Sequence, residues 1–364
     1  MLRGRQVDKV FLSIVSTLIL VGLLIFTSAS LGLLSRNGAS FSSVAMSQFA
    51  SVVIGCILAY IVSKIPYLFW RRASFYIFLI SIAVTLLVFL PNIGLTFGGG
   101  RRWIAIGSIS FQPGEFLKVA FVIYCAHWLT SAKDKITTFK GGLLPVIVLL
   151  TIVGVILLKQ PDTDTFVSIF LAAMGMYIVA GGKYRYLFLI ILISAIGFAA
   201  LVFSRPYLMQ RITTFINPAS DPLGSGYQIQ QSLISIGSGK LFGRGFGQSI
   251  QKFSYLPEPI GDSIFAVAAE EFGFIGGTFI ISLFLLFTLG SLRIATRAPD
   301  MYSGLLTVGI AILIVSGSFM NIASMLGVIP LSGLPLLFVS HGGSAMMLTL
   351  VQVGIILNIS KYRK

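Results

Sequence analysis

The sequence predicts an all-α polytopic membrane protein, and three observations lead to that class. Of its 364 residues, 56% are hydrophobic and only 10% are charged, and the mean hydropathy is +0.96. Apolar stretches of roughly 18 or more residues, each long enough to cross a bilayer as a helix, follow one another along the chain. The basic residues gather in short clusters between these stretches, as membrane topology requires.

Ten membrane spans can be assigned from this pattern in chain order. They cover residues 10–34, 44–63, 74–91, 112–132, 142–158, 164–181, 186–203, 262–291, 302–327 and 336–359. No internal repeat and no separate soluble segment interrupts them. We therefore expect residues 1–364 to form a single integral membrane domain.

The positions of the Lys and Arg residues orient these spans. With the N-terminus in the cytoplasm, every inside segment carries basic residues, namely Arg3, Arg5, Lys9, Lys64, Arg71, Arg72, Lys133, Lys135, Lys140, Lys183, Arg185, Arg293, Arg297, Lys361, Arg363 and Lys364. The outside segments contain fewer basic residues, spread over a greater length of chain, namely Arg36, Arg101, Arg102, Lys159, Arg205, Arg211, Lys240, Arg244 and Lys252. Both termini are therefore expected in the cytoplasm. The net charge of +15 reflects this topology, and we expect no nucleic-acid partner.

One connection is much longer than the others. Residues 204–261, between the seventh and eighth spans, exceed the length of an ordinary structureless loop, so we expect an ordered extracellular segment. Within it, the stretch GYQIQQSLISIGSG places Ile229, Leu233 and Ile236 on one helical face. The pattern predicts a short amphipathic helix that lies on or dips into the outer interface.

Asp262, at the start of the eighth span, is the first candidate for chemistry. An aspartate just before an apolar helix can serve as its N-cap, and the helix dipole would then keep it ionised. The alternative is a general base that takes a proton from a sugar hydroxyl late in bond formation. The two roles are compatible, because a capped carboxylate is held still.

The stretch GGGRRWIAIGSISFQPGEFLK leads into the fourth span. Arg101 and Arg102 lie outside, where the positive-inside rule disfavours them, which suggests an anionic ligand such as a phosphate or pyrophosphate.

Lys118 lies within that span, where a buried cation needs a partner. Glu115 is one turn away. Glu270 or Glu271, below Asp262 on the eighth span, could instead meet Lys118 across the bundle.

Two outside segments carry further charged residues. In KQPDTDT, Asp162 and Asp164 stand two residues apart and could hold a divalent cation such as Mg²⁺ or Mn²⁺, or form an ordinary solvated turn. In the glycine-rich GSGKLFGRGFGQSIQK, Lys240 and Arg244 could bind a phosphate, or the segment could be a flexible connector.

The cysteines and one histidine give weaker signals. Cys56 and Cys125 lie in predicted spans without metal-type spacing, so we expect free, buried thiols. His341 lies in PLSGLPLLFVSHGGSAM, whose prolines and glycines indicate irregular backbone at membrane depth. We expect it to be a hydrogen-bonded structural residue.

Four blocks of the chain resemble the signature blocks of one family. They are RRWIAIGSISFQPGEFLK, KQPDTDT, GRGFGQSIQKFSYLPEPIGDSIFAVAAEEFGFIG and SGLPLLFVSHGGSAM, in the expected order within a ten-span layout. On these residues the sequence resembles the SEDS proteins (shape, elongation, division and sporulation). The stretch GQSIQKFSYLPE looks closer to the FtsW branch than to the RodA branch.

The resemblance implies a peptidoglycan glycosyltransferase of the bacterial cytoplasmic membrane. Such an enzyme polymerises lipid II on the outer face for cell division, with inversion at the MurNAc anomeric carbon, beside a class B penicillin-binding transpeptidase. It implies that Asp262 deprotonates the 4-hydroxyl of the acceptor GlcNAc. It also implies a wider substrate-binding set around the departing undecaprenyl pyrophosphate, namely Arg102, Glu115, Lys118, Asp162, Lys240, Arg244 and Glu258.

The blocks also depart from the family pattern. Pro259, Ile260 and Gly261 stand where a His-Thr pair is usual, and His341 replaces a usual Tyr. These departures put the loop geometry and any histidine-assisted step in doubt, but they leave Asp262 in place.

Other functions remain open on the sequence alone. A lipid II flippase could use Glu270, Glu271 and Lys118 at membrane depth for proton-coupled transport. The chain could also be a scaffold of the division machinery without catalysis, or a RodA-type elongation polymerase.

Overall fold

The structure is a computed structural model that describes residues 6–35, 41–91, 93–97, 100–106, 109–220 and 224–362. Several residues named above lie outside the described residues, namely Arg3, Arg5, Arg36, Arg363 and Lys364. The described part is mostly helical, as the composition predicts.

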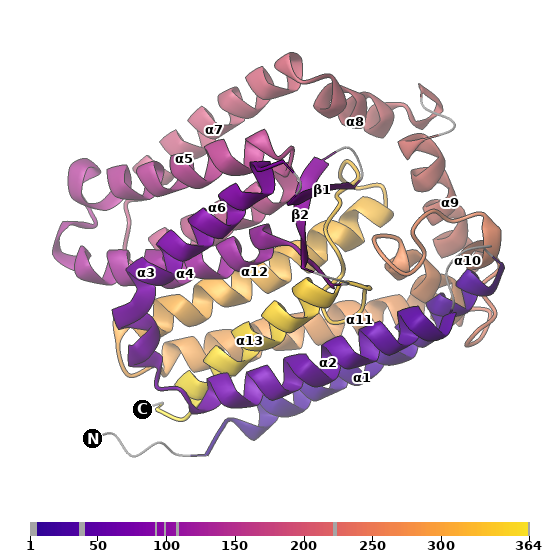
Figure 1. Cartoon of the computed structure of the whole chain (residues 1–364), viewed down its shortest axis with the longest axis horizontal. Helices are drawn as coiled ribbons and strands as arrows, with labels where there is room; N and C mark the ends of the chain where they lie inside the picture. Colours follow the sequence, from indigo (N-terminus) through magenta and orange to yellow (C-terminus); the bar gives the residue numbers. More distant parts are fainter. Residues whose placement is uncertain are drawn as a thin grey trace.

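Long helices form a bundle, and each of the ten predicted spans contains one of them (Figure 1). They are α1 (Lys9–Ser30), α2 (Phe41–Lys64), α3 (Tyr67–Leu86), α4 (Pro113–Ser131), α5 (Leu144–Lys159), α6 (Thr163–Val179), α7 (Tyr184–Ser204), α11 (Ile264–Thr296), α12 (Met301–Met325) and α13 (Gly343–Ser360). Within the described residues, eight are long and apolar enough to cross a membrane. The other two helices fall short of this length or apolarity: α4 carries the charged residues Glu115 and Lys118, and α6 has only 17 residues. The count of ten crossings stays a prediction.

Two of the predicted boundaries are wrong. Helix α3 begins at Tyr67 instead of residue 74, so that Arg71 lies in the helix, with its guanidinium 5.8 Å from the ring centre of Tyr302. Helix α13 begins at Gly343 instead of residue 336. The residues before it form the irregular backbone that their prolines and glycines indicate.

The centre of the bundle is formed by α12 and α13. In the apolar stretch of each helix, 72% and 78% of the residues are buried, against 22% for α2 and 12% for α7. The irregular segment before α13 packs directly on α1. A Cβ built on Gly22 of α1 would lie 2.0 Å from the carbonyl oxygen of Phe338, so only glycine allows this approach. The approach fixes residues 331–342 deep in the outer half of the bundle.

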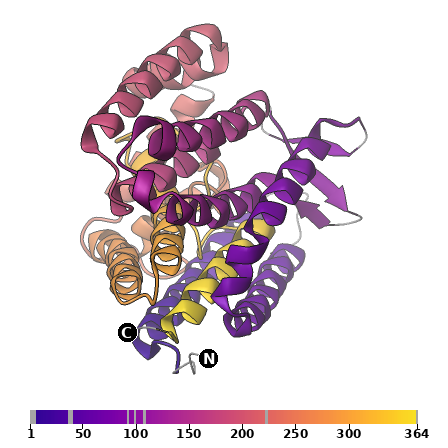
Figure 2. The ribbon, with the colours of Figure 1, turned by 90° about the vertical axis from the view of Figure 1, so that its left-hand side faces the viewer.

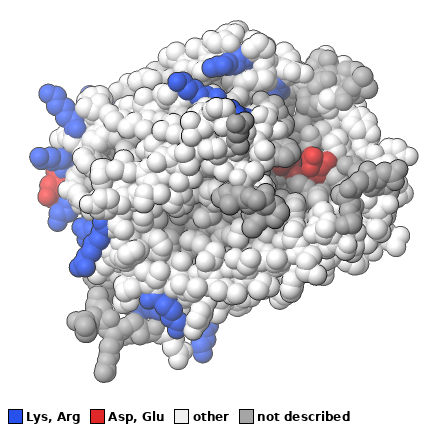
Figure 3. Space-filling model, viewed as in Figure 1, with Lys and Arg blue, Asp and Glu red and all other residues white. Residues whose placement is uncertain are grey.

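Short elements gather at the end of the bundle opposite both termini (Figure 1). They are β1 (Gly94–Phe97), β2 (Gly100–Ile106), β3 (Ile109–Phe111), α8 (Pro206–Ile216), η5 (Pro218–Ser220), α9 (Ser225–Ser238) and α10 (Gln251–Ser254). The remaining short turns are η1 (Leu31–Ser35), η2 (Leu87–Phe89), η3 (Lys133–Lys135) and η4 (Phe139–Leu143). The opposite end, where the termini lie, carries many of the visible Lys and Arg side chains (Figure 3), in agreement with a cytoplasmic location for that end.

The three strands form a small antiparallel sheet in the order β1-β2-β3 that projects from the bundle (Figure 2). Ile104 pairs with Phe111 between β2 and β3. The expectation of an all-α fold omitted this sheet.

The expected amphipathic helix is present as α9, but its buried face differs from the expected one. Ile229 is 3% exposed, whereas Leu233 is 43% exposed. The buried face instead includes Ser232 and Ser235, because Ser235 donates hydrogen bonds to Ala266 O and Glu270 Oε2 of α11. Polar contacts with α11 therefore set the orientation of α9.

Candidate active site

The turn that carries Asp262 is held by its backbone. Ser340 Oγ donates to Gly261 O at 2.8 Å, and His341 N donates to Ile260 O at 2.8 Å. Asn321 Nδ2 of α12 donates to Asp262 O at 2.8 Å. The irregular segment before α13 and the central helix α12 therefore fix the position of the Asp262 backbone without using its carboxylate.

The expected N-cap role of Asp262 is wrong. The N-cap of α11 is Ser263, whose side chain makes no capping bond. Backbone carbonyls satisfy the first amides instead, since Ile264 N bonds to Gly261 O and Ala266 N to Ser263 O. Among the described residues, no side chain or amide donates a hydrogen bond to the Asp262 carboxylate, which remains available for other chemistry.

The surroundings of Asp262 favour its protonated form. The pKa of Asp262 is raised from 3.8 to about 7. The main cause is displacement of water by the surrounding protein, and the negative charges of Glu258 and Asp164 act in the same direction. Arg211 and Arg102 act in the opposite direction. A carboxylate with a pKa near neutrality is suited to accept a proton during a reaction at physiological pH.

Asp164 joins three parts of the chain beside Asp262. Its carboxylate pairs with Arg211 of α8 at 3.1 Å and accepts a hydrogen bond from Gly333 N at 2.9 Å. The pair is partly open to solvent, with side-chain exposures of 28% for Arg211 and 15% for Asp164. The outer helix α8 is thereby connected to the first turn of α6 and to the segment before α13.

Arg102 of β2 reaches the same region from the sheet. Its Nε donates to Gln160 O at 3.2 Å, its Nη2 donates to Pro161 O, and its Nη1 lies 4.0 Å from Asp162 Oδ1. The small sheet therefore has a clear role, which is to place this guanidinium over the turn between α5 and α6.

Asp162 is a buried N-cap, with Oδ1 accepting from Thr165 N at 3.4 Å and with an exposure of 3%. Burial raises the pKa of Asp162, although the charge of Arg102 lowers it. Its Oδ2 has no hydrogen-bond partner among the described residues. Asp162 and Asp164 thus serve different partners, and no group of three His, Cys, Asp or Glu side chains suited to a metal ion occurs in the described part of the chain.

Glu115 and Lys118 form an ion pair at 2.7 Å and are both almost fully buried. Glu115, one turn away, is therefore the partner of Lys118, rather than Glu270 or Glu271. The start of α4 also touches the Asp162 carboxylate, because a Cβ built on Gly114 would lie 3.4 Å from Asp162 Oδ2.

Glu270 and Glu271 lie farther down α11 and are fully paired with residues of the outer segment. Glu271 Oε1 is 2.6 Å from Lys252 Nζ and also accepts from Ser28 of α1. Glu270 accepts from Ser249 Oγ at 2.6 Å and lies 3.3 Å from Arg244 Nε. Both carboxylates are therefore structural anions that hold residues 244–252 against the helix.

The same outer segment is inserted into the backbone of α11. In a regular helix, Phe274 N and Ile275 N would donate to Glu270 O and Glu271 O. Here Phe274 N and Ile275 N donate to Lys240 O and Leu241 O, at 2.8 and 3.2 Å, while the freed carbonyls of Glu270 and Glu271 accept from Arg244 N and Gly245 N, at 3.0 and 2.9 Å.

Glycine makes this insertion possible. Gly273 has φ +67° and breaks α11, and a Cβ built on it would lie 2.3 Å from Gly243 N. Lys240 and Arg244 are fixed at this level, about 10–18 Å along α11 from Asp262 at 1.5 Å per residue. The structure does not bring them to the Asp262 carboxylate.

Two other candidates can be placed. Glu258 is exposed, and its carboxylate lies beside Gly261, where a built Cβ would be 3.3 Å from Glu258 Oε2. The His341 ring stacks on Phe26 at 5.8 Å, and its Nδ1 has no partner among the described residues. The expected side-chain hydrogen bond of His341 is therefore absent at this nitrogen.

Sequence reasoning missed Arg211, Asn321 and Ser340. Arg211 carries the signal that singled out Arg102, a cation outside the membrane against the positive-inside rule. Asn321 and Ser340 are polar residues in apolar stretches, where a buried amide or hydroxyl needs partners, but their partners cannot be read from the sequence.

Comparison with known proteins decides the family. The FtsW/RodA/SpoVE cell cycle protein family matches residues 8–364. Stage V sporulation protein E of Bacillus subtilis is 39% identical over 357 residues, covering 98% of each chain. The chain belongs to the FtsW/RodA/SpoVE family.

Other members agree with this assignment. A probable peptidoglycan glycosyltransferase FtsW of Geobacter sp. strain M18 is 38% identical over 313 residues, covering 86% of this chain and 85% of that protein. RodA of Thermus thermophilus shares the fold, with a TM-score of 0.71 at 21% identity over 98% of this chain and 97% of that one. A chain of a peptidoglycan synthase complex that coordinates polymerization and crosslinking has a TM-score of 0.81 at 22% identity, covering 98% of each chain. The FtsW/RodA/SpoVE membership, with the apolar helices, places the chain in the bacterial cytoplasmic membrane as a multi-pass protein.

Proposed function

We propose that the chain is a peptidoglycan glycosyltransferase that polymerises lipid II on the outer face of the cytoplasmic membrane. The observation that carries the proposal is the Asp262 carboxylate, which is fixed through its backbone, has no hydrogen-bond donor among the described residues and has a pKa of about 7. The names of the FtsW relatives supply the reaction class. A relative named FtsW, at 38% identity, and the sporulation protein, at 39%, are both more similar to this chain than the RodA chain is at 21%, which supports the FtsW branch over the RodA branch. We therefore propose cell division as its role.

In the proposed reaction, Asp262 accepts the proton of the 4-hydroxyl of the acceptor GlcNAc. The oxygen forms a bond to the anomeric carbon of the donor MurNAc from the face opposite the leaving group, so the configuration inverts. The bond from that carbon to undecaprenyl pyrophosphate breaks, and the pyrophosphate leaves with the electron pair. A base with a pKa near 7 accepts the proton as the hydroxyl becomes acidic along the reaction.

The pyrophosphate needs cations close to Asp262, and two guanidiniums are near it. Arg102 and Arg211 both act electrostatically on Asp262, and both are partly exposed. Arginine suits the recognition of phosphate oxygens because its donors form a planar fork. We therefore assign the pyrophosphate contact to Arg102 and Arg211. Lys240 and Arg244 instead hold the outer segment against α11, and Lys118 forms an ion pair with Glu115 near the start of α4.

A class B penicillin-binding transpeptidase is the proposed partner, since a glycan polymerase must hand its strands to a cross-linking enzyme. The likeness to a chain of a complex that coordinates the two activities supports this partnership. The flippase alternative gains no support from Glu115, Lys118, Glu270 and Glu271, because each is held in a short ion pair within the described residues.

The test uses purified protein and lipid II, with and without the transpeptidase, and with no other polymerase. The unmodified chain is expected to make uncross-linked glycan strands. Asp262→Asn, which keeps the shape of the side chain, is expected to reduce the rate about 10²–10⁴-fold. Asp134→Asn, at an exposed carboxylate of the cytoplasmic end, is the matched control and is expected to leave the rate unchanged.

Two results would count against the proposal. Full polymerisation by Asp262→Asn would remove the assigned base. Movement of labelled lipid II across vesicles by the unmodified chain, without strand synthesis under either condition, would favour the flippase.

A further inference from the structure

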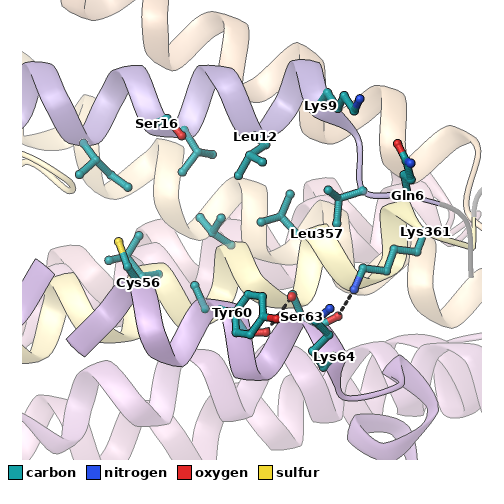
Figure 4. A pocket seen from close by; sticks show the side chains of 16 residues that line it. Gln6, Lys9, Leu12, Ser16, Cys56, Tyr60, Ser63, Lys64, Leu357 and Lys361 are labelled. Carbon is teal, nitrogen blue, oxygen red and sulfur yellow. Dashed lines mark hydrogen bonds between the residues drawn. The ribbon is translucent and has the colours of Figure 1, made fainter. Parts of the chain in front are cut away.

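A cavity of about 650 Å³ lies at the cytoplasmic end of the bundle, far from Asp262 and between α1, α2 and α13 (Figure 4). Its size is that of a typical small-molecule or lipid site in a protein. The side chains that line it divide into a cationic end and an apolar end, and none of them is acidic.

The cationic end is formed by Lys9, Lys64 and Lys361, one from each of the three elements. Lys361 Nζ donates to Ser63 O at 2.6 Å, and Lys64 Nζ lies 5.0 Å from the ring centre of Tyr60. Partial burial and the charge of Lys64 lower the pKa of Lys361, so the two ammonium groups repel each other. Among the described residues, no carboxylate is paired with these three lysines.

Asp8 is the nearest acid in sequence, but it is committed elsewhere. It is 6% exposed, and its carboxylate caps α1 by accepting from Phe11 N at 3.0 Å. Its own amide donates to Ser360 Oγ at 3.1 Å. Asp8 faces into the protein and does not line the cavity. Lys9, Lys64 and Lys361 therefore leave positive charge at this end of the cavity that an anion from outside the chain can neutralise.

The other end of the cavity is apolar. It is lined by Leu12, Val15 and Ile19 of α1 and by Leu350 and Val353 of α13. The distance along α1 from Lys9 to Ile19 is about 15 Å at 1.5 Å per residue. A ligand must therefore present negative charge at the membrane surface and an apolar chain that runs toward the bilayer centre.

The walls of the cavity continue into the lipid-facing surface. Two of the lining residues are themselves exposed, Leu12 of α1 at 40% and Cys56 of α2, on helices that are apolar enough to span the membrane. A molecule can therefore enter sideways from the cytoplasmic leaflet. Basic pockets between spanning helices on this side suit the head groups of anionic lipids.

The geometry points to a binding site for one anionic phospholipid of the cytoplasmic leaflet. The phosphate of the lipid contacts Lys9, Lys64 and Lys361, and one acyl chain fills the space between Leu12, Val15 and Leu350. The bound lipid joins α1 to the pair α2 and α13 at the end of the bundle where a cavity otherwise separates them. The site is independent of the proposed glycosyl transfer.

The first test measures lipid retention by native mass spectrometry after delipidated protein is mixed with phosphatidylglycerol or phosphatidylcholine. The unmodified chain is expected to retain one phosphatidylglycerol and little phosphatidylcholine. The triple variant Lys9→Gln, Lys64→Gln, Lys361→Gln is expected to lose at least about tenfold in phosphatidylglycerol retention, which corresponds to about 1.4 kcal/mol. The variant Lys133→Gln, Lys135→Gln, Lys140→Gln removes the same charge from exposed positions of the same end and is expected to behave as the unmodified chain.

A second variant separates a built site from simple surface attraction. Ser16→Trp places a large side chain in the apolar end and changes no charge. We expect it to lower phosphatidylglycerol retention as strongly as the triple variant does. Equal retention by Ser16→Trp and the unmodified chain would mean that only surface charge attracts the lipid, and the cavity site would be rejected.

A third readout does not depend on detergent. Cys56, which was expected to be buried, is exposed, because it lines the apolar end of the cavity, while Cys125 is buried as expected and serves as an internal control. N-ethylmaleimide should modify Cys56 several-fold more slowly in phosphatidylglycerol vesicles than in phosphatidylcholine vesicles, and the triple variant should abolish the difference. Equal rates for the unmodified chain in both vesicles, or equal retention of both lipids, would overturn the proposal.

Discussion

The acidic residues at the outer end of α11 fall into two groups that differ in their partners: Glu270 and Glu271 on the one hand, and Asp262 on the other. Glu270 and Glu271 are surrounded by donors and cations, and their exposures are 0% and 1%. Asp262, about two turns earlier, has a fixed backbone and a carboxylate without a donor among the described residues. Buried anions that stabilise a fold are saturated with partners, whereas an anion that must accept a proton needs a vacant oxygen. The difference in partners separates structural from reactive acids more clearly than burial alone.

The largest expected effect on stability comes from removing one half of a saturated pair. Glu271→Ala leaves Lys252, which is 0% exposed, without an ion-pair partner among the described residues, although Ser28 Oγ, Gly247 O and the Phe253 ring remain near its ammonium group. We expect a loss of roughly 3–5 kcal/mol of unfolding free energy, measured by thermal or denaturant unfolding in detergent. The double variant Glu271→Leu, Lys252→Met removes both charges and is expected to recover most of the loss. A single variant as stable as the unmodified chain would contradict the structural role.

The opposite result is expected for the reactive acid. The pKa of Asp262 is raised from 3.8 to about 7, so its ionisation disfavours the folded state and stability falls as pH rises between these values. Asp262→Asn, although inactive, should therefore melt at a higher temperature than the unmodified chain at pH 8. The difference should shrink as the pH is lowered toward 4. A lower melting temperature for Asp262→Asn at pH 8 would place Asp262 with the structural acids.

Arg211 offers an intermediate test, because it acts on Asp262 through its charge. Arg211→Gln removes a cation that lowers the pKa of Asp262, and it also leaves Asp164 without its ion-pair partner. We expect about a tenfold fall in polymerisation rate, equal to roughly 1.4 kcal/mol. Arg211→Lys keeps the charge and should retain more of the rate. Equal rates for Arg211→Gln and the unmodified chain would exclude the pyrophosphate contact.

The smallest effect expected is a shift in pH dependence. Because a base works when deprotonated, the rate of the unmodified chain should rise through about pH 7 and level off above it. In Arg211→Gln the midpoint should move to higher pH, since a cation that favours the ionised form is gone. An unshifted midpoint would show that the charge of Arg211 does not affect the pKa of Asp262.

The sequence predicts the helical membrane class well, for a clear physical reason. Long apolar stretches fix helix existence because the bilayer leaves few alternatives for the backbone. The Glu115–Lys118 pair also follows from helical spacing. The small sheet was missed, although RRWIAI and ISF flanking a Gly-Ser pair carry a hairpin pattern.

Other features depend on contacts between distant parts of the chain. Glu270 and Glu271 could not be assigned to Arg244 and Lys252, because those cations belong to a connection whose path does not follow from periodicity. The expected N-cap role of Asp262 failed because nearby carbonyls occupy the first helical amides. Local rules predict which groups need partners, and tertiary structure decides which partners they find.

The insertion at Gly273 interrupts α11, but the inserted segment is bonded to both sides of the break. Arg244 N and Gly245 N donate to carbonyls of the outer portion, residues 264–272, while the first amides of the longer inner portion, which crosses the membrane, donate to Lys240 O and Leu241 O. Spanning helices tilt when bilayer thickness changes. Because the inserted segment replaces the two missing helical bonds across Gly273, we expect it to hold the outer portion, and the aspartate at its tip, at a fixed angle to the spanning portion when the helix tilts.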